Sequence, residues 1–86
     1  YPSAVAELEA LFTVARAGSI SKAARELGTN QQTMSARIAR AERALGITVF
    51  ERSPYGVSPT EKGQVLIDAL PDLLAACHRF SGIAAS

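Results

Sequence analysis

The sequence predicts a mainly α-helical domain that carries one small β-hairpin. Three observations lead to this fold class. Apolar residues recur at helical spacing in four segments, and a short β-branched and aromatic stretch interrupts them between the third and the fourth. The chain has 86 residues, which is enough for one compact unit but not for a two-domain enzyme. Only 6% of the residues are aromatic, so Leu, Ile, Val and Ala must fill the core.

The first helix is expected over residues 4–17. Apolar side chains recur there at spacings of three and four, which places them on one stripe of a helix. These residues are Leu8, Leu11, Phe12 and Ala15. Gly18 follows and is expected to end the helix, because glycine adopts the left-handed conformation of a C-cap with little strain.

A short second helix is expected over residues 22–27. Ser21 is placed as its N-cap, since a serine hydroxyl can accept a hydrogen bond from a free backbone N–H of the first turn. Ala23 and Ala24 are small, so another helix can approach closely. Gly28 is expected to end this helix and begin a tight turn.

A third helix is expected over residues 31–45. Asn30 can cap its first turn, and Gly46 can end it. Four apolar residues share one face and are expected to point into the core. They are Met34, Ile38, Ala41 and Leu45.

A hairpin is expected after the third helix. Residues 47–52 are β-branched and aromatic-rich and too few for a helix, residues 53–56 have the composition of a turn, and residues 57–59 form a plausible return strand. Pro59 has no backbone N–H to donate, which confines the return strand to an edge.

A long final helix is expected after Thr60, its predicted N-cap. Apolar residues recur in it at spacings of 4, 3, 4 and 3, the pattern of a seam between two helices. The seam consists of Leu66, Leu70, Leu73, Cys77 and Phe80. The first part, especially Val65 and Leu66, is expected to pack on the chain's own helices, whereas the remainder needs another partner. Pro71 lies inside the helix and is expected to bend or restart it, because it removes one backbone hydrogen bond.

The element order describes a winged helix-turn-helix with a three-helix core. If Ile38 points inward, a rotation of about 100° per residue turns a polar and basic set outward. This set contains Gln32, Thr33, Ala36, Arg40 and Arg43, with Arg37 on the flank. The set has no acid, and Gln and Thr can hydrogen bond to base edges in the major groove while arginines contact phosphates. A solvated helix face is the alternative for such a pattern in isolation.

Composition and charge distribution exclude several classes of protein. The net charge is only +1, but residues 22–52 hold six basic and three acidic residues. Cys77 is the one cysteine and His78 the one histidine, so no intrachain disulfide and no Cys/His zinc site can form, and no catalytic constellation is visible. No apolar run approaches the roughly 18 residues of a membrane span. We expect a soluble, cytoplasmic, non-enzymatic protein without cofactor or metal, and we interpret Cys77 as a small buried hydrophobe and His78 as a surface residue.

Dispersed motifs point to a family. They comprise residues 17–28, then Gln31, Ser35, Ile38 and Glu42, then residues 45–47 and 49–52, and finally Gly56, Val57, Thr60 and Gly63. In order and spacing they resemble the amino-terminal DNA-binding domain of LysR-type transcriptional regulators. The similarity covers residues 4–80, which is nearly the whole chain.

This resemblance implies a bacterial regulator that reads double-stranded DNA. Its recognition helix would begin near Asn30 and enter the major groove, and its wing would lie over the minor groove. The expected DNA-binding residues are Ser21, Asn30, Gln31, Gln32, Thr33, Ser35, Ala36, Arg37, Arg40, Arg52 and Tyr55. Asn30 and Ser35 lie at positions that resemble phosphate contacts. Gln31, Gln32 and Thr33 lie where the base-reading segment begins.

The chain also departs from the family pattern. Members often carry Pro at Gln32, a basic residue at Ala36 and at Tyr55, and Leu at Ala41 and Pro59. Two cations are therefore missing, although Arg37 can replace the one at position 36.

The resemblance further implies a homodimer on a pseudo-palindromic site. Residues 1–60 would be the DNA-binding unit, and residues 61–86 the linker and dimerisation helix, paired antiparallel with the same helix of a second subunit. A small-molecule effector would bind only in a carboxy-terminal domain that is absent from this sequence.

Several alternatives stay open. Arg52 contacts a phosphate or the minor groove, or else it pairs with Glu51 or Glu42. Glu42 is expected to make a structural contact, and Tyr55 either donates to a phosphate or is an ordinary exposed turn residue. The module as a whole could serve only for dimerisation, or it could belong to a molybdate-responsive type of regulator.

Overall fold

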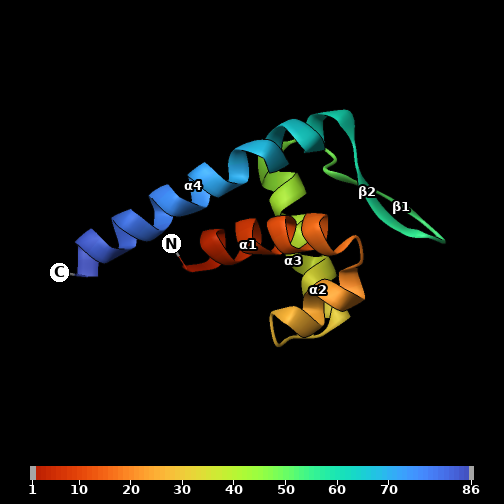
Figure 1. The fold of residues 1–86 in the computed structure, drawn as a ribbon, viewed down its shortest axis with the longest axis horizontal. Helices are drawn as coiled ribbons and strands as arrows, with labels where there is room; N and C mark the ends of the chain where they lie inside the picture. Colours follow the sequence, from red (N-terminus) through yellow and green to blue (C-terminus); the bar gives the residue numbers. More distant parts are fainter. Residues whose placement is uncertain (1, 86) are drawn as a thin grey trace.

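The computed structural model describes the backbone of residues 2–85 and the side chains of residues 5–79. Within this range the chain forms four helices and one hairpin: α1 (Pro2–Ala17), α2 (Ile20–Glu26), α3 (Gln31–Leu45), β1 (Phe50–Ser53), β2 (Gly56–Pro59) and α4 (Glu61–Ala85). In Figure 1 the helices α1, α2 and α3 gather into a bundle, the hairpin projects from one end, and α4 extends toward the other. The expected fold class is confirmed.

Most helix ends lie where the sequence places them. The Asn30 side-chain oxygen accepts a hydrogen bond from the Thr33 N–H at 2.8 Å, and Thr60 Oγ1 accepts one from the Gly63 N–H at 2.9 Å. Gly18 and Gly46 follow α1 and α3 with φ of +70° and +71°. These ends depend on contacts within three or four residues, which local sequence can reveal.

The predicted start of α2 is wrong. The N-cap is Ser19, whose Oγ accepts from the Lys22 N–H at 3.3 Å, and the helix begins at Ile20. Ile20 is 7% exposed and belongs to the core. Burial of this side chain favours a helix that begins two residues earlier than predicted. Ser21 therefore lies inside the first turn, and its hydroxyl contacts another helix.

The core lies where α1, α3 and α4 meet. Leu11 and Val14 from α1, Met34 and Ile38 from α3 and Leu70 from α4 are nearly inaccessible. The predicted inner face of α3 is confirmed for Met34, Ile38 and Ala41. It is wrong for Leu45, which is 45% exposed because α3 ends there at the surface, beside Leu8 and Glu7.

The hairpin is a two-stranded antiparallel ladder that pairs Phe50 with Pro59 and Ser53 with Gly56. The Val57 N–H donates to the Gly18 carbonyl at 3.3 Å, which ties β2 to the turn between α1 and α2. Gly56 has φ +128°, and a Cβ there would lie 2.7 Å from the Gly18 oxygen, so this close approach requires glycine. The wing is thus docked onto the turn between α1 and α2 by the part of β2 that adjoins the hairpin turn.

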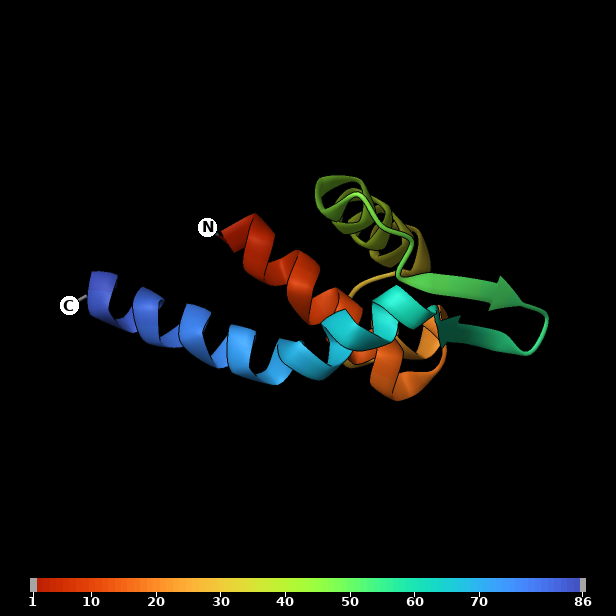
Figure 2. The same cartoon turned by 90° about the horizontal axis from the view of Figure 1, so that it is seen from above.

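The helix α4 continues through Pro71 without a restart. Pro71 is exposed, so its ring and the free carbonyl of Ile67 can be accommodated toward solvent. Figure 2 shows α4 running beside α1. Residues Leu66, Ile67, Leu70 and Leu74 pack inward. Val65 was expected to pack there too, but it is 71% exposed because its position on the helix turns it away from this face.

Candidate nucleic-acid interface

The outer face of α3 is exposed and carries no acid. Met34 and Ile38 are 0% and 2% exposed, so the opposite side of the helix must face solvent. The exposed residues on and beside it are Gln31, Gln32, Ala36, Ala39, Arg40 and Arg43. Thr33, Ser35 and Arg37 are half-buried on the flanks. Ala39 was not predicted here, although its spacing of seven from Gln32 indicates the same face.

Glu42 is turned away from this face, which explains the missing acid. Its Oε2 accepts hydrogen bonds from the Val49 N–H at 2.6 Å and from the Phe50 N–H at 3.4 Å. These contacts hold the start of β1 against the second half of α3. The structural role expected for Glu42 is confirmed.

Arg40 has an acidic partner on α1. Its Nε lies 3.8 Å from Glu7 Oε1, and its side chain remains 60% exposed. Arg40 is therefore available to solvent, but it lies on the edge of the outer face that borders α1. Arg43, one turn further along, forms no ion pair among the described residues.

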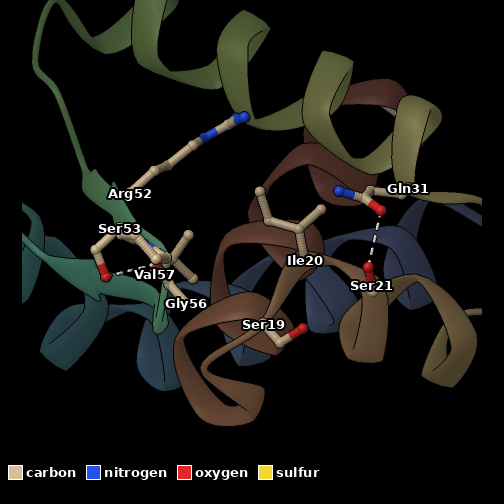
Figure 3. Close-up of a pocket in the computed structure, with 9 residues that line it drawn as sticks. Ser19, Ile20, Ser21, Gln31, Arg52, Ser53, Gly56 and Val57 are labelled. Carbon is tan, nitrogen blue, oxygen red and sulfur yellow. Dashed lines mark hydrogen bonds between the residues drawn. The ribbon is translucent and has the colours of Figure 1, made fainter.

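A side-chain hydrogen bond joins α2 to the first residue of α3. Ser21 Oγ donates to Gln31 Oε1 at 2.8 Å, as Figure 3 shows. Asn30, next to Gln31, uses its own side-chain oxygen to cap α3. The beginning of α3 is thus held both to its own backbone and to α2.

The wing contributes Arg52 from β1. The side chain extends toward α3 across a surface pocket of about 220 Å³ that lies between α2, α3 and the hairpin (Figure 3). None of the ion pairs among the described residues includes Arg52, so the predicted alternative of pairing with Glu51 or Glu42 is wrong. Tyr55, at the tip of the hairpin, is 99% exposed. Both side chains are exposed, and that of Arg52 extends toward α3.

The predicted seam of α4 is split between two environments. Leu70 is 0% exposed in the chain's own core, and the half-buried Leu66 packs against that core, as expected for the first part of the helix. Cys77 is half-buried, Leu73 is 41% exposed, and the Phe80 side chain lies outside the described residues. The short helical bundle covers only one side of α4.

An exposed apolar stripe runs along α4 next to its buried face. It follows the spacing of a single helix side and consists of Val65, Ala69, Leu73 and Ala76. The spacing of these residues is visible in the sequence. They were not predicted as a stripe, because the larger residues at spacings of 4, 3, 4 and 3 were assigned to a seam instead. His78 is exposed as predicted, with its Nε2 3.3 Å from Glu9 Oε1 on α1.

The described residues contain no cluster of three His, Cys, Asp or Glu side chains that could hold a metal ion. In the same part of the chain, none of the helices combines the length and the apolar character needed to span a membrane.

Comparisons with known proteins agree with this geometry. Residues 5–64 match the family model described as bacterial regulatory helix-turn-helix protein, lysR family. The chain is 41% identical over 70 residues to the small neutral protease regulatory protein of Streptomyces coelicolor, covering 81% of this chain and 21% of that protein. It is 44% identical over 61 residues to the transcriptional regulator BbuR of Bordetella bronchiseptica, covering 71% of this chain and 19% of that protein.

A solved structure shares the whole architecture. The CbnR DNA-binding domain, crystallised as a complex with DNA, superposes with a TM-score of 0.85 at 25% identity and covers 94% of this chain and 93% of that one. The chain spans about a fifth of the length of the curated relatives it matches. The exposed acid-free helix, the docked wing and the matching family model lead to one conclusion: the chain belongs to the lysR family of bacterial regulatory helix-turn-helix proteins.

Proposed function

We propose that this chain binds double-stranded DNA sequence-specifically as the DNA-binding domain of a LysR-type transcriptional regulator in the bacterial cytoplasm. The single observation that carries the proposal is the exposed, acid-free face of α3 beside Arg52, a cation without an acidic partner among the described residues. The CbnR domain of the same fold was solved with DNA, which supports this polyanion as the ligand. In this role the domain positions DNA and catalyses no reaction.

In this proposal α3 lies in the major groove, which is about 12 Å wide and admits a helix. Gln31, Gln32 and Thr33 would reach base edges from the first turn. The methyl groups of Ala36 and Thr33 could contact thymine methyls.

Phosphate contacts would surround this base-reading turn. Asn30 and Ser35 could donate hydrogen bonds to the backbone of one strand. Arg37 and Arg40 would add positive charge along the helix, with the charge of Arg40 partly offset by Glu7. Arg52 and the Tyr55 hydroxyl would reach the flanking minor groove or its phosphates from the wing.

The exposed stripe of α4 supports a homodimer. An apolar stripe on a helix that runs beyond the core is stabilised when another apolar surface covers it. We propose residues 1–60 as the DNA-binding unit and residues 61–86 as a linker and dimerisation helix that pairs with the same helix of a second copy. Leu73 and Cys77 would contribute to this contact, as would Phe80. A twofold dimer presents two copies of α3 to a pseudo-palindromic site.

A small-molecule effector would bind to a further domain, because the curated relatives are about five times longer than the matched region. Regulation would then be transmitted to the DNA-binding domain through α4.

Fluorescence anisotropy with a mixed-sequence duplex at low salt tests DNA binding. We expect binding at micromolar protein, with an affinity that falls as salt rises by a slope of about 0.9 for each phosphate contact. Lys62→Ala is the matched control, since Lys62 is an exposed cation that lies on α4, outside α3 and the hairpin. Absence of binding at low salt would favour a module that serves only for dimerisation.

Selection from random DNA then identifies the preferred site. A palindromic consensus would support the dimer, whereas an enriched pool without a consensus would contradict sequence-specific recognition. The half-site spacing would follow from the distance between the two α3 helices.

A further inference from the structure

The wing is anchored through β2, the strand that does not carry Arg52. Val57 on β2 donates its N–H to the Gly18 carbonyl at 3.3 Å, and its half-buried side chain packs against the core. The backbone of Gly56 lies so close to the same carbonyl that an added Cβ would be 2.7 Å from the Gly18 oxygen. The turn between α1 and α2 therefore sets where β2 lies on the bundle.

The pairing of the two strands links this anchor to Arg52. Arg52 and Val57 are direct partners across the antiparallel hairpin. Side chains of such partners project from the same face of a two-stranded sheet, with their Cβ atoms about 4.5–5.5 Å apart. The face that packs on the bundle through Val57 is thus also the face from which Arg52 projects, and Figure 3 shows Arg52 extending toward α3.

The acidic neighbour of Arg52 lies on the opposite face of the hairpin. Successive side chains of a strand alternate between the two faces, so Glu51 and its partner Ser58 project away from the face of Val57. Both residues are exposed. With the face of Val57 held against the bundle, the cation of β1 extends toward α3 while the acid points the other way.

We propose that Gly56 is a positioning residue for DNA binding, because its lack of a side chain lets β2 dock at Gly18 and so holds Arg52 beside α3. The inference rests on the proposed function, in which Arg52 contacts a phosphate or the minor groove next to the site bound by α3. Gly56 itself needs no contact with DNA. A wing displaced from Gly18 would carry Arg52 with it, and the contact would be lost.

The test compares Gly56→Ala with Arg52→Ala by fluorescence anisotropy, on one duplex over a range of salt concentrations. Gly56→Ala places a Cβ against the Gly18 carbonyl and should displace the wing. We expect it to weaken binding about tenfold, as the loss of one charge-assisted contact does, and to lower the salt slope by about 0.9. The variant that combines both substitutions should bind as weakly as Arg52→Ala alone, because the displaced arginine no longer contributes.

Gly46→Ala is the matched control for backbone strain. Gly46 has φ +71° and Gly56 has φ +128°, so alanine is strained at both positions, but a Cβ at Gly46 meets nothing within 4 Å. Gly46→Ala should therefore lower the melting temperature yet keep the wild-type salt slope. Thermal melting defines a temperature at which the variants are folded, and their affinities are compared there.

Val57→Ala tests the same anchor without a strained backbone. It keeps the N–H that bonds to Gly18 and removes part of the side chain that packs against the core. We expect a loss of affinity of about threefold, and no further loss when Arg52 is already alanine. If Gly56→Ala does not fold, this variant decides: a loss that adds to that of Arg52→Ala, or no loss at all, would overturn the inference.

The outcomes separate this inference from the proposed function. If Gly56→Ala is folded and keeps the wild-type affinity and salt slope, or if its loss adds to that of Arg52→Ala, the positioning role is overturned and DNA binding stands. The same conclusion follows if Gly46→Ala lowers the slope equally, or if Arg52→Ala binds as tightly as wild type. If wild type binds no duplex at low salt, both proposals fail together.

Discussion

Replacing Glu42 should destabilise the domain far more than replacing a neighbouring exposed acid. The Glu42 carboxylate accepts backbone hydrogen bonds from Val49 at 2.6 Å and from Phe50 at 3.4 Å. Val49 is 0% exposed, so its N–H depends on the Glu42 carboxylate for a hydrogen-bond partner. The contact also joins α3, which carries the proposed DNA-reading face, to the first strand of the wing.

The geometry sets the size of the effect. A hydrogen bond to a charged group contributes about 1.5–3 kcal/mol, and a buried donor left without a partner costs about 1–3 kcal/mol. The 3.4 Å contact is long and adds little. We therefore expect Glu42→Ala to lower the free energy of unfolding by about 2–3 kcal/mol, and the melting temperature by about 10–20 °C in a domain of this size.

Urea denaturation and thermal melting measure these values directly. Glu42→Gln retains an acceptor oxygen but loses the charge, and it should lower the stability by about 1 kcal/mol. Glu51→Ala is the control, because Glu51 is exposed on β1 and its replacement should change stability by less than about 0.5 kcal/mol. If Glu42→Ala had the same melting temperature as Glu51→Ala, the stabilising role of the Glu42 carboxylate would be contradicted. Faster amide exchange at Val49 in Glu42→Ala would localise the effect.

Three further substitutions test the proposed interface and dimer. Arg52→Ala should weaken binding to all duplexes alike and reduce the salt slope by about 0.9, because one phosphate contact is lost; an unchanged slope would place Arg52 outside the interface. Gln32→Ala should alter the preference at one base pair by about 1–3 kcal/mol, and equal losses on every sequence would contradict a base-reading role. Leu73→Asp should shift the protein toward monomer in sedimentation velocity. Ala75→Asp, on the polar side of α4, is the control and should not change the oligomeric state. A dimer that persists in Leu73→Asp would exclude the exposed stripe of α4 as the dimer contact.

The parts of the fold that depend on local contacts could be predicted from the sequence. The caps at Asn30 and Thr60 involve a partner three residues away, and Gly46 ends α3 at the predicted position. The burial of Met34 and Ile38 follows from their spacing on one helix. The exposed polar side of α3, from which the candidate interface was predicted, is the necessary complement of that buried side.

Spacing alone misassigned the residues whose surroundings come from distant parts of the chain. In α4 the heptad-like pattern grouped Leu70 with Leu73, yet Leu70 fills the core beneath α1 and Leu73 faces solvent. Periodicity reports which residues share a side of a helix, but it does not report how much of that side a small bundle covers.

Helical periodicity is a local property, so the amino-acid pattern alone was enough to identify an amphipathic third helix with a basic, acid-free outer side. Three pairs of neighbours could be found only once the elements were packed together: Arg40 lies beside Glu7, Arg52 approaches α3 without an acidic partner among the described residues, and Ser21 is hydrogen-bonded to Gln31. These neighbours come from different elements, and their meeting depends on how α1, α2 and the wing pack around α3.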